Sequence, residues 1–439
     1  MKLYNKIVLL ALALAFFSSC EKDEGPSPDD SFLNFEIPNV KVTEDFPVGV
    51  YYFNPGSGGQ DGARYKRLSD PYELGNEKVG PYVDLHFGNY KINYDENRLT
   101  DEMVDIIQQH VDWCIDGGVD FLIMPALRAE KNKLAPNCLS GDYRFYDLVR
   151  GKTASTVAGS GKRVDMKSLK YAITINIEDP ICKSNWETYN EDGTLTNKKA
   201  TTLSNTMILD DHDELVAFVD GKTYSRTDMF KEFFKSLSTY FEDERYFRVD
   251  GKPLVVLQSP HKLYVKNSKA FYDELRQVVK EYTGVDMYIV AQQDSWTPPA
   301  RYEHFYKNAV DAVTHKNMYN QGTWDRSLFY PQTIYLNWEY TRKYLKENWG
   351  GTDYIPTGAV AFSGYVDNGN YDKPIVNFKD DTFRTMCNVM KSQAGNHRIV
   401  FIDSFNQIQY SSFLEPTKKD YGNGFGTEFL DIVKEQFKK

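Results

Sequence analysis

Eight short runs of β-branched and aromatic residues alternate along this chain with segments of helical periodicity. Turn-forming residues bound the runs, and each run has the length of a buried strand. Strands that alternate with helices favour parallel β-α-β units, and eight units favour a closed barrel because closure leaves no sheet edge exposed. We therefore predict an α/β fold, a single-domain (β/α)8 TIM barrel with long loops at its C-terminal face. The predicted strands begin at Val48, Phe121, Tyr171, Leu254, Met287, Val310, Ala359 and Ile399.

An open, doubly wound sheet is the alternative fold. No G-x-G-x-x-G motif follows any predicted strand, so the sequence indicates no dinucleotide cofactor. No C-x-x-C or Cys/His spacing indicates a metal site either. The net charge of −10 comes without a basic stripe, which argues against a nucleic-acid partner.

The N-terminus has the pattern of a secretory signal. Lys2 and Lys6 precede an apolar run from Ile7 to Phe17, and Ser18-Ser19-Cys20 follows. The run is shorter than the about 20 residues that a membrane-spanning helix needs. The next segment is charged and Pro-rich, as flexible tethers are. We predict a signal peptide over 1–19, an anchor and tether over 20–46, and a barrel over 47–439.

Cys20 directly after the two serines resembles a bacterial lipobox, in which this cysteine would carry lipid. The Lys-Asp-Glu that follows resembles the export signal of surface lipoproteins in Bacteroidota-type bacteria. This resemblance implies a lipoprotein of the outer membrane, held in the bilayer through Cys20 and exposed at the cell surface.

The loop after the last predicted strand carries the most specific pattern. It runs Phe405-Asn406-Gln407-Ile-Gln-Tyr410-Ser-Ser-Phe-Leu-Glu415-Pro416. The segment resembles the F-N-E-W-x-E-G-x-x-x-E-P motif of glycoside hydrolase family 99 and its barrel relatives. In that register, Gln407 and Tyr410 replace both catalytic glutamates of the family. Glutamine cannot transfer a proton near neutral pH, and tyrosine ordinarily titrates near 10.

The resemblance covers about residues 48–430. The aromatic first strand, the segment before the middle strand and the segment before the last helix resemble the same family in the same order. These segments are Tyr51 to Phe53, Asp243 to Pro253, and Tyr354 to Asp367. The resemblance implies a carbohydrate ligand and no cofactor.

Other carboxylates at strand ends are candidates to replace the missing acids. Glu178 ends the third predicted strand and is the first candidate, although an Asp-Pro turn explains this segment equally well. Asp367 and Asp403 are the next two catalytic candidates. Loop solvation is the alternative role for Asp367, and a hydrogen bond to backbone amides is the favoured alternative for Asp403.

Aromatic and polar residues near the strand ends are candidates for substrate binding. We expect the barrel mouth to bind a neutral or mildly charged oligosaccharide, with aromatic rings stacked on sugar faces. Asp294 and Trp296 follow the fifth predicted strand, and His315 ends the sixth. The predicted binding residues are Tyr52, His86, Trp296, His315, Asn406, Gln407, Tyr410 and Glu415.

Three functions fit these observations. The favoured one is a glycoside hydrolase-like enzyme with a divergent active site, acting on a polysaccharide or glycan. The second is a non-catalytic glycan-binding lipoprotein on the same barrel. The third is glycosyl transfer, which the export signal opposes because activated sugar donors are cytoplasmic. Two carboxyl groups about 5 to 10 Å apart across an open cleft would favour hydrolysis.

Overall fold

The computed structural model describes most of the chain after residue 31, and Ile37–Lys439 forms one compact unit, distinct from Met1–Glu36. Among the described residues, no helix combines the length and apolar character needed to cross a membrane. The predicted domain boundaries stay predictions. The described ranges are 32–55, 62–74, 77–94, 97–129, 139–141, 143–157, 159–177, 188–189, 192, 194–196, 202–203, 206–211, 213, 215–219, 222–321, 329–369 and 375–439.

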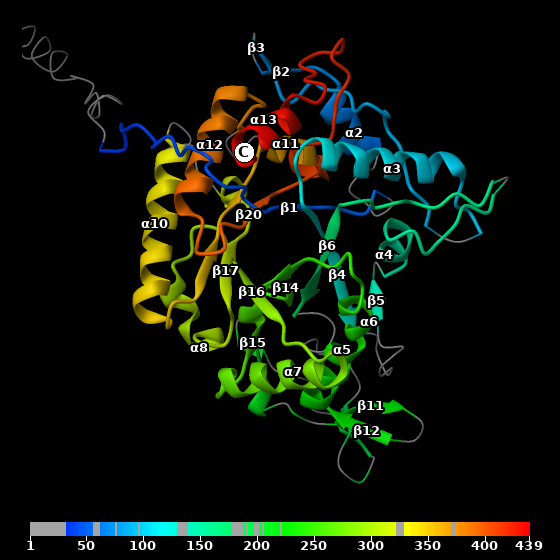
Figure 1. The fold of residues 1–439 in the computed structure, drawn as a ribbon, viewed down its shortest axis with the longest axis vertical. Helices are drawn as coiled ribbons and strands as arrows, with labels where there is room; N and C mark the ends of the chain where they lie inside the picture. Colours follow the sequence, from blue (N-terminus) through cyan, green and yellow to red (C-terminus); the bar gives the residue numbers. More distant parts are fainter. Residues whose placement is uncertain are drawn as a thin grey trace, which may run out of the picture. The chain divides into compact units, whose positions relative to one another are not determined.

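A closed ring of parallel strands forms the centre of this unit, which confirms the predicted (β/α)8 barrel. Each strand pairs in parallel with its neighbours, and the first pairs with the last, Val50 opposite Ile402. The barrel strands surround the centre of the view in Figure 1. In ring order they are β1 (Val48–Tyr51), β4 (Phe121–Ala129), β6 (Lys170–Asn176), β14 (Lys252–Gln258), β16 (Tyr288–Gln293), β17 (Ala312–His315), β18 (Asp353–Ile355) with β19 (Thr357–Gly358), and β20 (Val400–Ile402).

The seventh barrel position differs from its prediction. It is filled by two short strands, β18 and β19, on either side of Pro356, and not by Ala359 to Phe362. Proline has no N–H to donate, so it interrupts the ladder. The predicted run is buried, but it lies beyond the strand. Apolar character alone therefore placed this strand too late in the chain.

Helices surround the barrel, with α3, α7, α10 and α12 lying outside the strands in Figure 1. Thr100 caps the start of α3, because its hydroxyl accepts a hydrogen bond from the Met103 N–H at 3.3 Å. The helices are α2 (Gly62–Ser69), α3 (Asp101–Asp116), α4 (Tyr143–Val149), α5 (Arg226–Ser236), α6 (Ser238–Phe241), α7 (Ser268–Thr283), α8 (Glu303–Tyr306), α10 (Tyr330–Asn348), α11 (Gly364–Asn368), α12 (Asp380–Gln393) and α13 (Glu428–Phe437).

Shorter strands form small additional sheets or extend the main one. They are β2 (Tyr72–Leu74), β3 (Glu77–Val79), β5 (Leu139–Gly141), β7 (Thr188–Tyr189), β8 (Leu195–Thr196), β9 (Thr202–Leu203), β10 (Thr206–Ile208), β11 (Leu215–Val219), β12 (Lys222–Ser225), β13 (Arg248–Val249), β15 (Leu263–Tyr264), β21 (Asn406–Gln407) and β22 (Ser412–Phe413).

Two hydrophobic cores lie on either side of the barrel wall. The inner core fills the barrel and includes Tyr51, Phe121 and Phe401. The outer core packs between the strands and the helices and includes Tyr52 and Ile402. Successive strand residues alternate between the two cores because side chains of a strand point to opposite faces. This alternation decides which residues can reach the mouth of the barrel.

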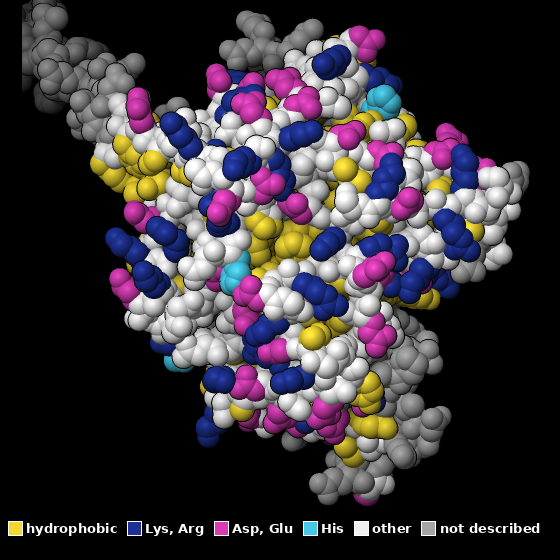
Figure 2. All heavy atoms as spheres, in the orientation of Figure 1, with side chains coloured by type: hydrophobic (Ala, Val, Ile, Leu, Met, Phe, Trp, Pro, Cys, Tyr) yellow, Lys and Arg dark blue, Asp and Glu magenta, His cyan; other side chains and the backbone are white. Residues whose placement is uncertain are grey.

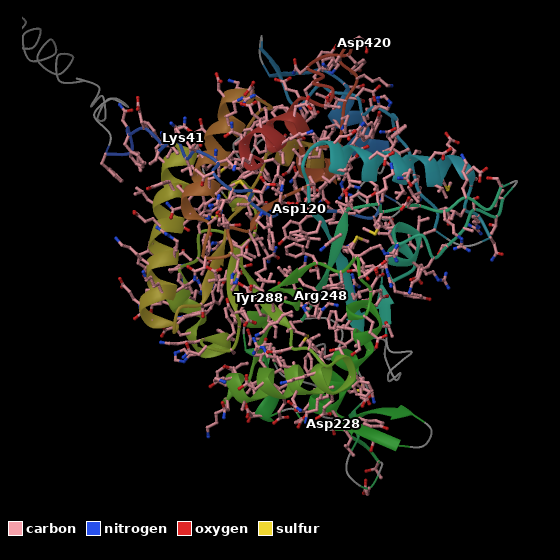
Figure 3. All side chains as sticks on the ribbon, viewed as in Figure 1. Lys41, Asp120, Asp228, Arg248, Tyr288 and Asp420 are labelled. Atoms are coloured by element: carbon pink, nitrogen blue, oxygen red, sulfur yellow. The ribbon has the colours of Figure 1, made fainter. Side chains whose placement is uncertain are left out.

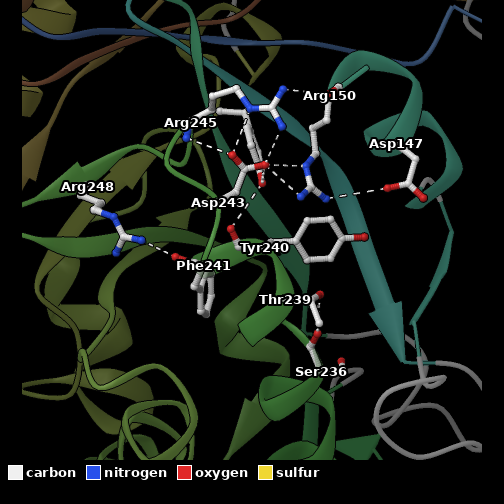
Figure 4. A network of polar contacts seen from close by, with 10 residues as sticks. Asp147, Arg150, Ser236, Thr239, Tyr240, Phe241, Asp243, Arg245 and Arg248 are labelled. Atoms are coloured by element: carbon white, nitrogen blue, oxygen red, sulfur yellow. Dashed lines mark hydrogen bonds and ion pairs between the residues drawn. The ribbon is translucent and has the colours of Figure 1, made fainter. Parts of the chain in front are cut away.

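Charged pairs join the segments that lead into the strands. Asp243 binds Arg150, at 2.9 Å from Nη2, and Arg245, at 3.0 Å from Nε, as Figure 4 shows. The Arg245 carbonyl accepts a hydrogen bond from the N–H of Tyr171 in β6. Asp120, immediately before β4, accepts one from the Val48 N–H at 2.6 Å and is marked in Figure 3. On the face drawn in Figure 2, Lys and Arg side chains are interspersed with Asp and Glu.

Candidate functional site

A cavity of about 250 Å³ opens at the C-terminal ends of the barrel strands. This is the end where TIM-barrel enzymes place their active sites. Its described lining comes from the ends of seven of the eight barrel positions and the loops that follow them. The lining residues are Tyr51, Phe53, Asn176, Gln258, Ser259, Gln292, Lys316, Asn317, Asn320, Thr357, Asp403, Gln407 and Tyr410.

A row of amide side chains lines one side of this mouth cavity. Asn176, Gln258 and Gln292 are paired in register on β6, β14 and β16, so they lie at one level of the barrel. The Gln292 Nε2 donates a hydrogen bond to the Tyr51 hydroxyl at 2.8 Å, which links β16 to β1 across the barrel. Amides both donate and accept, as recognition of sugar hydroxyl groups requires.

Asp403 is the only carboxylate among the described lining residues. It follows β20 and has the same parity as Phe401, which points into the barrel. Burial raises the pKa of Asp403 to about 7, although a hydrogen bond with Asn317 opposes the shift. A carboxyl group with this pKa is partly protonated at neutral pH and can both give and take a proton.

Gln407 and Tyr410 also line the cavity, as predicted. The backbone N–H of Gln407 donates to the Ser404 Oγ at 2.8 Å, which fixes the start of the loop. The Tyr410 ring stacks on Phe362 at 5.8 Å between ring centroids. Burial, followed by the negative charge of Asp367, raises the pKa of Tyr410. Tyr410 therefore stays a neutral phenol near pH 7 and offers a hydroxyl group.

Lys316 is the only cation among the described lining residues, and Asp294 neutralises it. Its Nζ lies 2.7 Å from the Asp294 Oδ1. Asp294 follows β16, as predicted, but it is not among the described lining residues, and its carboxylate pairs with Lys316 and His261. The mouth is therefore rich in amides and hydroxyls, with little net charge.

Two predicted binding residues point to the outer core. Tyr52 is 2% exposed, and its hydroxyl pairs with His110 Nδ1 at 2.9 Å. His315 is fully buried and pairs with the Tyr354 hydroxyl at 2.8 Å, and burial lowers its pKa to about 4. The prediction that they contact sugar is therefore wrong. Each lies one residue from a lining residue, Tyr51 or Lys316, and alternation turns it to the other face.

Asn406 and Glu415 are buried residues that hold neighbouring segments of the mouth cavity in place. The Asn406 side chain accepts from the Phe53 N–H at 2.7 Å and donates to the Phe53 carbonyl at 2.8 Å. Glu415 is fully buried and accepts from the Tyr90 hydroxyl at 3.1 Å, with His110 Nε2 at 3.5 Å. Both side chains are buried among protein groups, which contradicts their predicted contact with substrate. The contact between Glu415 and Tyr90 joins the loop after β20 to the segment before α3.

Three other predicted residues lie outside the described lining of the mouth cavity. Trp296 stacks near Tyr330, and its Nε1 donates to the Met318 carbonyl at 2.7 Å. His86 is exposed, and its ring meets the Trp113 ring of α3 at 5.3 Å. Asp367 pairs with Arg64 at 3.0 Å. Asp367 lies close enough to the lining residue Tyr410 to raise its pKa.

Glu178 and Cys20 lie outside the described residues. Their predicted roles, catalysis and lipidation, therefore stay predictions. Glu178 comes two positions after Asn176, a residue that lines the cavity.

Sequence reasoning missed most of the polar lining. Tyr51, Asn176, Gln258, Gln292 and Lys316 all lie at or directly after strand ends. The signal available in the sequence was the alternation of strand side chains. A polar residue that follows an inward-pointing apolar residue by two positions points inward too. Gln258 after Val256 and Gln292 after Val290 follow this rule.

Comparisons with known proteins agree with this architecture. A family model described as Glycosyltransferase WbsX matches residues 212–433, just over half of the chain. A solved "Glycoside hydrolase-like protein" is similar with a TM-score of 0.66 and 23% identity, over 94% of this chain and 99% of that one. The GH99 endo-alpha-mannosidase from Bacteroides thetaiotaomicron is similar with a TM-score of 0.50 and 12% identity, over 89% and 95% of the two chains.

No curated protein matches the chain. At these identities the two solved structures establish the fold alone, a barrel like that of family 99 glycoside hydrolases. The family model covers the second half of the barrel, from the segment before α5 to α13. The chain thus belongs to the family described as Glycosyltransferase WbsX.

Proposed function

We propose that the protein is a glycoside hydrolase-like enzyme that cleaves a glycan in the mouth cavity, with Asp403 as the proton-transferring carboxyl. The observation that carries the proposal is the raised pKa of Asp403, about 7, at the floor of an amide-lined cavity. Functional carboxyls are often perturbed in this way, because proton transfer is most effective when the pKa is near the working pH.

Cleavage of a glycosidic bond in most families needs two carboxyl groups. Protonated Asp403 would donate its proton to the leaving oxygen. In the sequence register of the family 99 motif, Gln407 and Tyr410 stand where the acids would be, and we propose that these two lining residues hold sugar hydroxyls instead. Glu178 remains our candidate for the second carboxyl, which would activate water or attack the sugar.

The proposal is tested by measuring new reducing ends after incubation of the purified protein with a panel of polysaccharides. We expect turnover in the wild type, and loss of turnover in both Asp403→Asn and Glu178→Gln with glycan affinity kept. Asp420→Asn, at an exposed carboxyl, is the matched control and should retain full activity. Full activity in Asp403→Asn would contradict the proposal.

A non-catalytic glycan-binding protein is the second candidate. It is favoured by the lining itself, in which Asp403 is the one described carboxylate among many amides and hydroxyls. Retention of a polysaccharide without any release of reducing ends, by the wild type and by Asp403→Asn alike, would select this function.

Glycosyl transfer is suggested by the description of the family. Transfer and hydrolysis differ in the acceptor, which is a sugar hydroxyl in one and water in the other. Product analysis with and without an added acceptor sugar separates them. Longer oligosaccharides formed only with the acceptor would select transfer.

For the location of the protein, we propose lipid attachment at Cys20, followed by exposure at the outer surface of the cell. The support is the order of basic residues, apolar run and cysteine in the sequence. Cys20→Ser should release the protein from the membrane fraction or block its processing. Unchanged fractionation would remove this proposal.

A further inference from the structure

A second cavity, of about 680 Å³, lies beside the mouth cavity. It is built from the loops that follow β14 and β16, the same loops that contribute to the mouth. Ser259 lines the mouth, whereas His261 and Lys262, two and three residues later, line the second cavity. The two cavities therefore occupy neighbouring places at the same end of the barrel.

One ion pair separates the two cavities. Lys316 lines the mouth and Asp294 lines the second cavity, and their Nζ and Oδ1 atoms are 2.7 Å apart. His261 Nε2 approaches the other Asp294 oxygen at 3.3 Å. The linings of the two cavities therefore meet at this ion pair.

The second cavity carries an excess of positive charge. Asp294 is its only carboxylate among the described lining residues, and Lys316 neutralises it. Lys262 and Arg301 also line the cavity, and neither pairs with a carboxylate among the residues that the structure describes. This excess stands out in a chain whose net charge is −10.

A neighbouring acid has a backbone partner of its own. Asp210 follows the lining residue Ile208 by two positions, and its Oδ2 accepts a hydrogen bond from the Lys266 N–H at 2.7 Å. The Asp210 carboxylate thus binds the backbone and is not part of the described lining.

Aromatic rings supply the apolar part of the cavity. Tyr302 is buried against His261, with ring centroids 5.1 Å apart. Tyr264 and Phe305 meet edge to face at 6.1 Å. Rings beside cationic groups suit a sugar that has an apolar C–H face and an anionic substituent.

We propose that the second cavity is a subsite for an acidic sugar residue, whose carboxylate or sulfate group binds Arg301 and Lys262. This inference rests on the proposed function, because it extends the glycan from the mouth. It also sharpens the neutral or mildly charged ligand expected from the sequence into an acidic one.

The test measures binding by calorimetry in the Asp403→Asn background, so that nothing is cleaved. The probes are tetragalacturonic acid for the carboxylate, a carrageenan tetrasaccharide for the sulfate, and maltotetraose as the neutral control. At least one acidic probe should bind more tightly than maltotetraose and weaken with added salt. The preferred probe identifies the anionic group.

Matched variants locate the binding. Arg301→Gln with Lys262→Gln should weaken the acidic probe about tenfold, because the charge-assisted hydrogen bonds are lost. Arg342→Gln with Lys343→Gln, at exposed positions of α10, should change nothing. Melting temperature checks that both double variants are folded.

Two results would overturn the inference: acidic probes that bind no better than maltotetraose, or wild-type affinity in the Arg301 and Lys262 double variant. Neither result bears on the proposed function, which is tested separately by the release of reducing ends by the wild type. Conversely, acidic probes that bind through Arg301 to a protein without turnover would support the proposed subsite and contradict the proposed hydrolase activity.

Discussion

The two ends of the barrel use aspartate in opposite ways. At the N-terminal end, Asp243 is held between Arg150 and Arg245. Burial disfavours its charge, but hydrogen bonds from Arg245 and Arg150 outweigh burial and lower its pKa. At the C-terminal end, Asp403 has no such cationic partner among the residues that the structure describes, and burial raises its pKa to about 7. The same side chain thus stabilises the fold at one end and can transfer protons at the other.

The difference follows from what each end must do. Asp311 and Asp353 at the N-terminal end accept backbone hydrogen bonds, from the Ile289 N–H at 2.8 Å and the Asn396 N–H at 2.8 Å. These carboxylates satisfy donors that the strand ladder leaves over. The C-terminal end leaves Asp403, Gln407 and Tyr410 facing a cavity. Substitutions at the two ends should therefore separate stability from activity.

The largest effect is expected at the C-terminal end. Asp403→Asn should lower kcat by about 10²- to 10⁴-fold, the contribution of a positioned proton donor. It should not lower stability, because a neutral amide avoids the cost of a buried charge. Steady-state kinetics measures the effect on kcat, and urea denaturation at pH 8 measures the effect on stability. Reduced stability with unchanged kcat would reverse the roles of the two ends.

At the N-terminal end, Asp243→Asn should cost about 3 kcal/mol of unfolding free energy, because it leaves two arginines without their carboxylate. Urea denaturation at pH 7 measures the loss, with Asp420→Asn as the control. The folded pKa of Asp243 lies below its unfolded value, so its contribution is full above about pH 4. It is lost as the pH falls through the folded pKa. A reducing-end assay should show normal activity.

A smaller effect tests the alternation between the faces of β1. Tyr52→Phe should lower stability by about 1 kcal/mol through loss of the bond to His110 and leave glycan affinity unchanged. Tyr51→Phe removes the hydroxyl that binds Gln292 at the mouth, and should weaken glycan binding instead. Calorimetry measures the glycan affinity of both variants, and urea denaturation measures their stability. The opposite pattern would place Tyr52, not Tyr51, at the site.

The smallest effect is expected from His397 at the N-terminal end. Its ring nitrogens lie 2.9 Å from Asp353 and 2.9 Å from Asp250. Burial opposes protonation, but the two aspartates outweigh it and raise the pKa. Its stabilisation is therefore present below about pH 6.5 and fades as the pH rises through the folded pKa. His397→Gln should cost less than about 1 kcal/mol at pH 5, because solvent screens Asp250. An equal cost at pH 5 and pH 9 would argue against this pair.

The sequence predicted the barrel, because eight alternating units have few other closed arrangements. It also placed Gln407 and Tyr410 at the mouth, and it named Asp403 as a candidate while favouring a backbone partner for it. It failed by one residue at two strand ends, where it chose Tyr52 in place of Tyr51 and His315 in place of Lys316. The reason is physical: strands of a parallel barrel are apolar on both faces, so the pattern does not mark the inward side.

The second cavity could not be predicted from the strands at all. Its cations, Lys262 and Arg301, come from loops whose folding depends on tertiary contacts, such as the ion pair between Asp294 and Lys316. Charge at a loop position has no periodicity to indicate its neighbours. The shift of the seventh strand has a local cause by contrast, since Pro356 was visible in the sequence.

The most direct test of the account is the titration of Asp403 itself. Isotope-edited infrared or carbon NMR spectra of the wild type, with Asp403→Asn as the difference control, give the pKa of this one carboxyl group. We predict a value of about 7, and a kcat/KM that falls as Asp403 loses its proton above that pH. A carboxyl that titrates near 4, as an ordinary exposed aspartate does, would contradict the central claim.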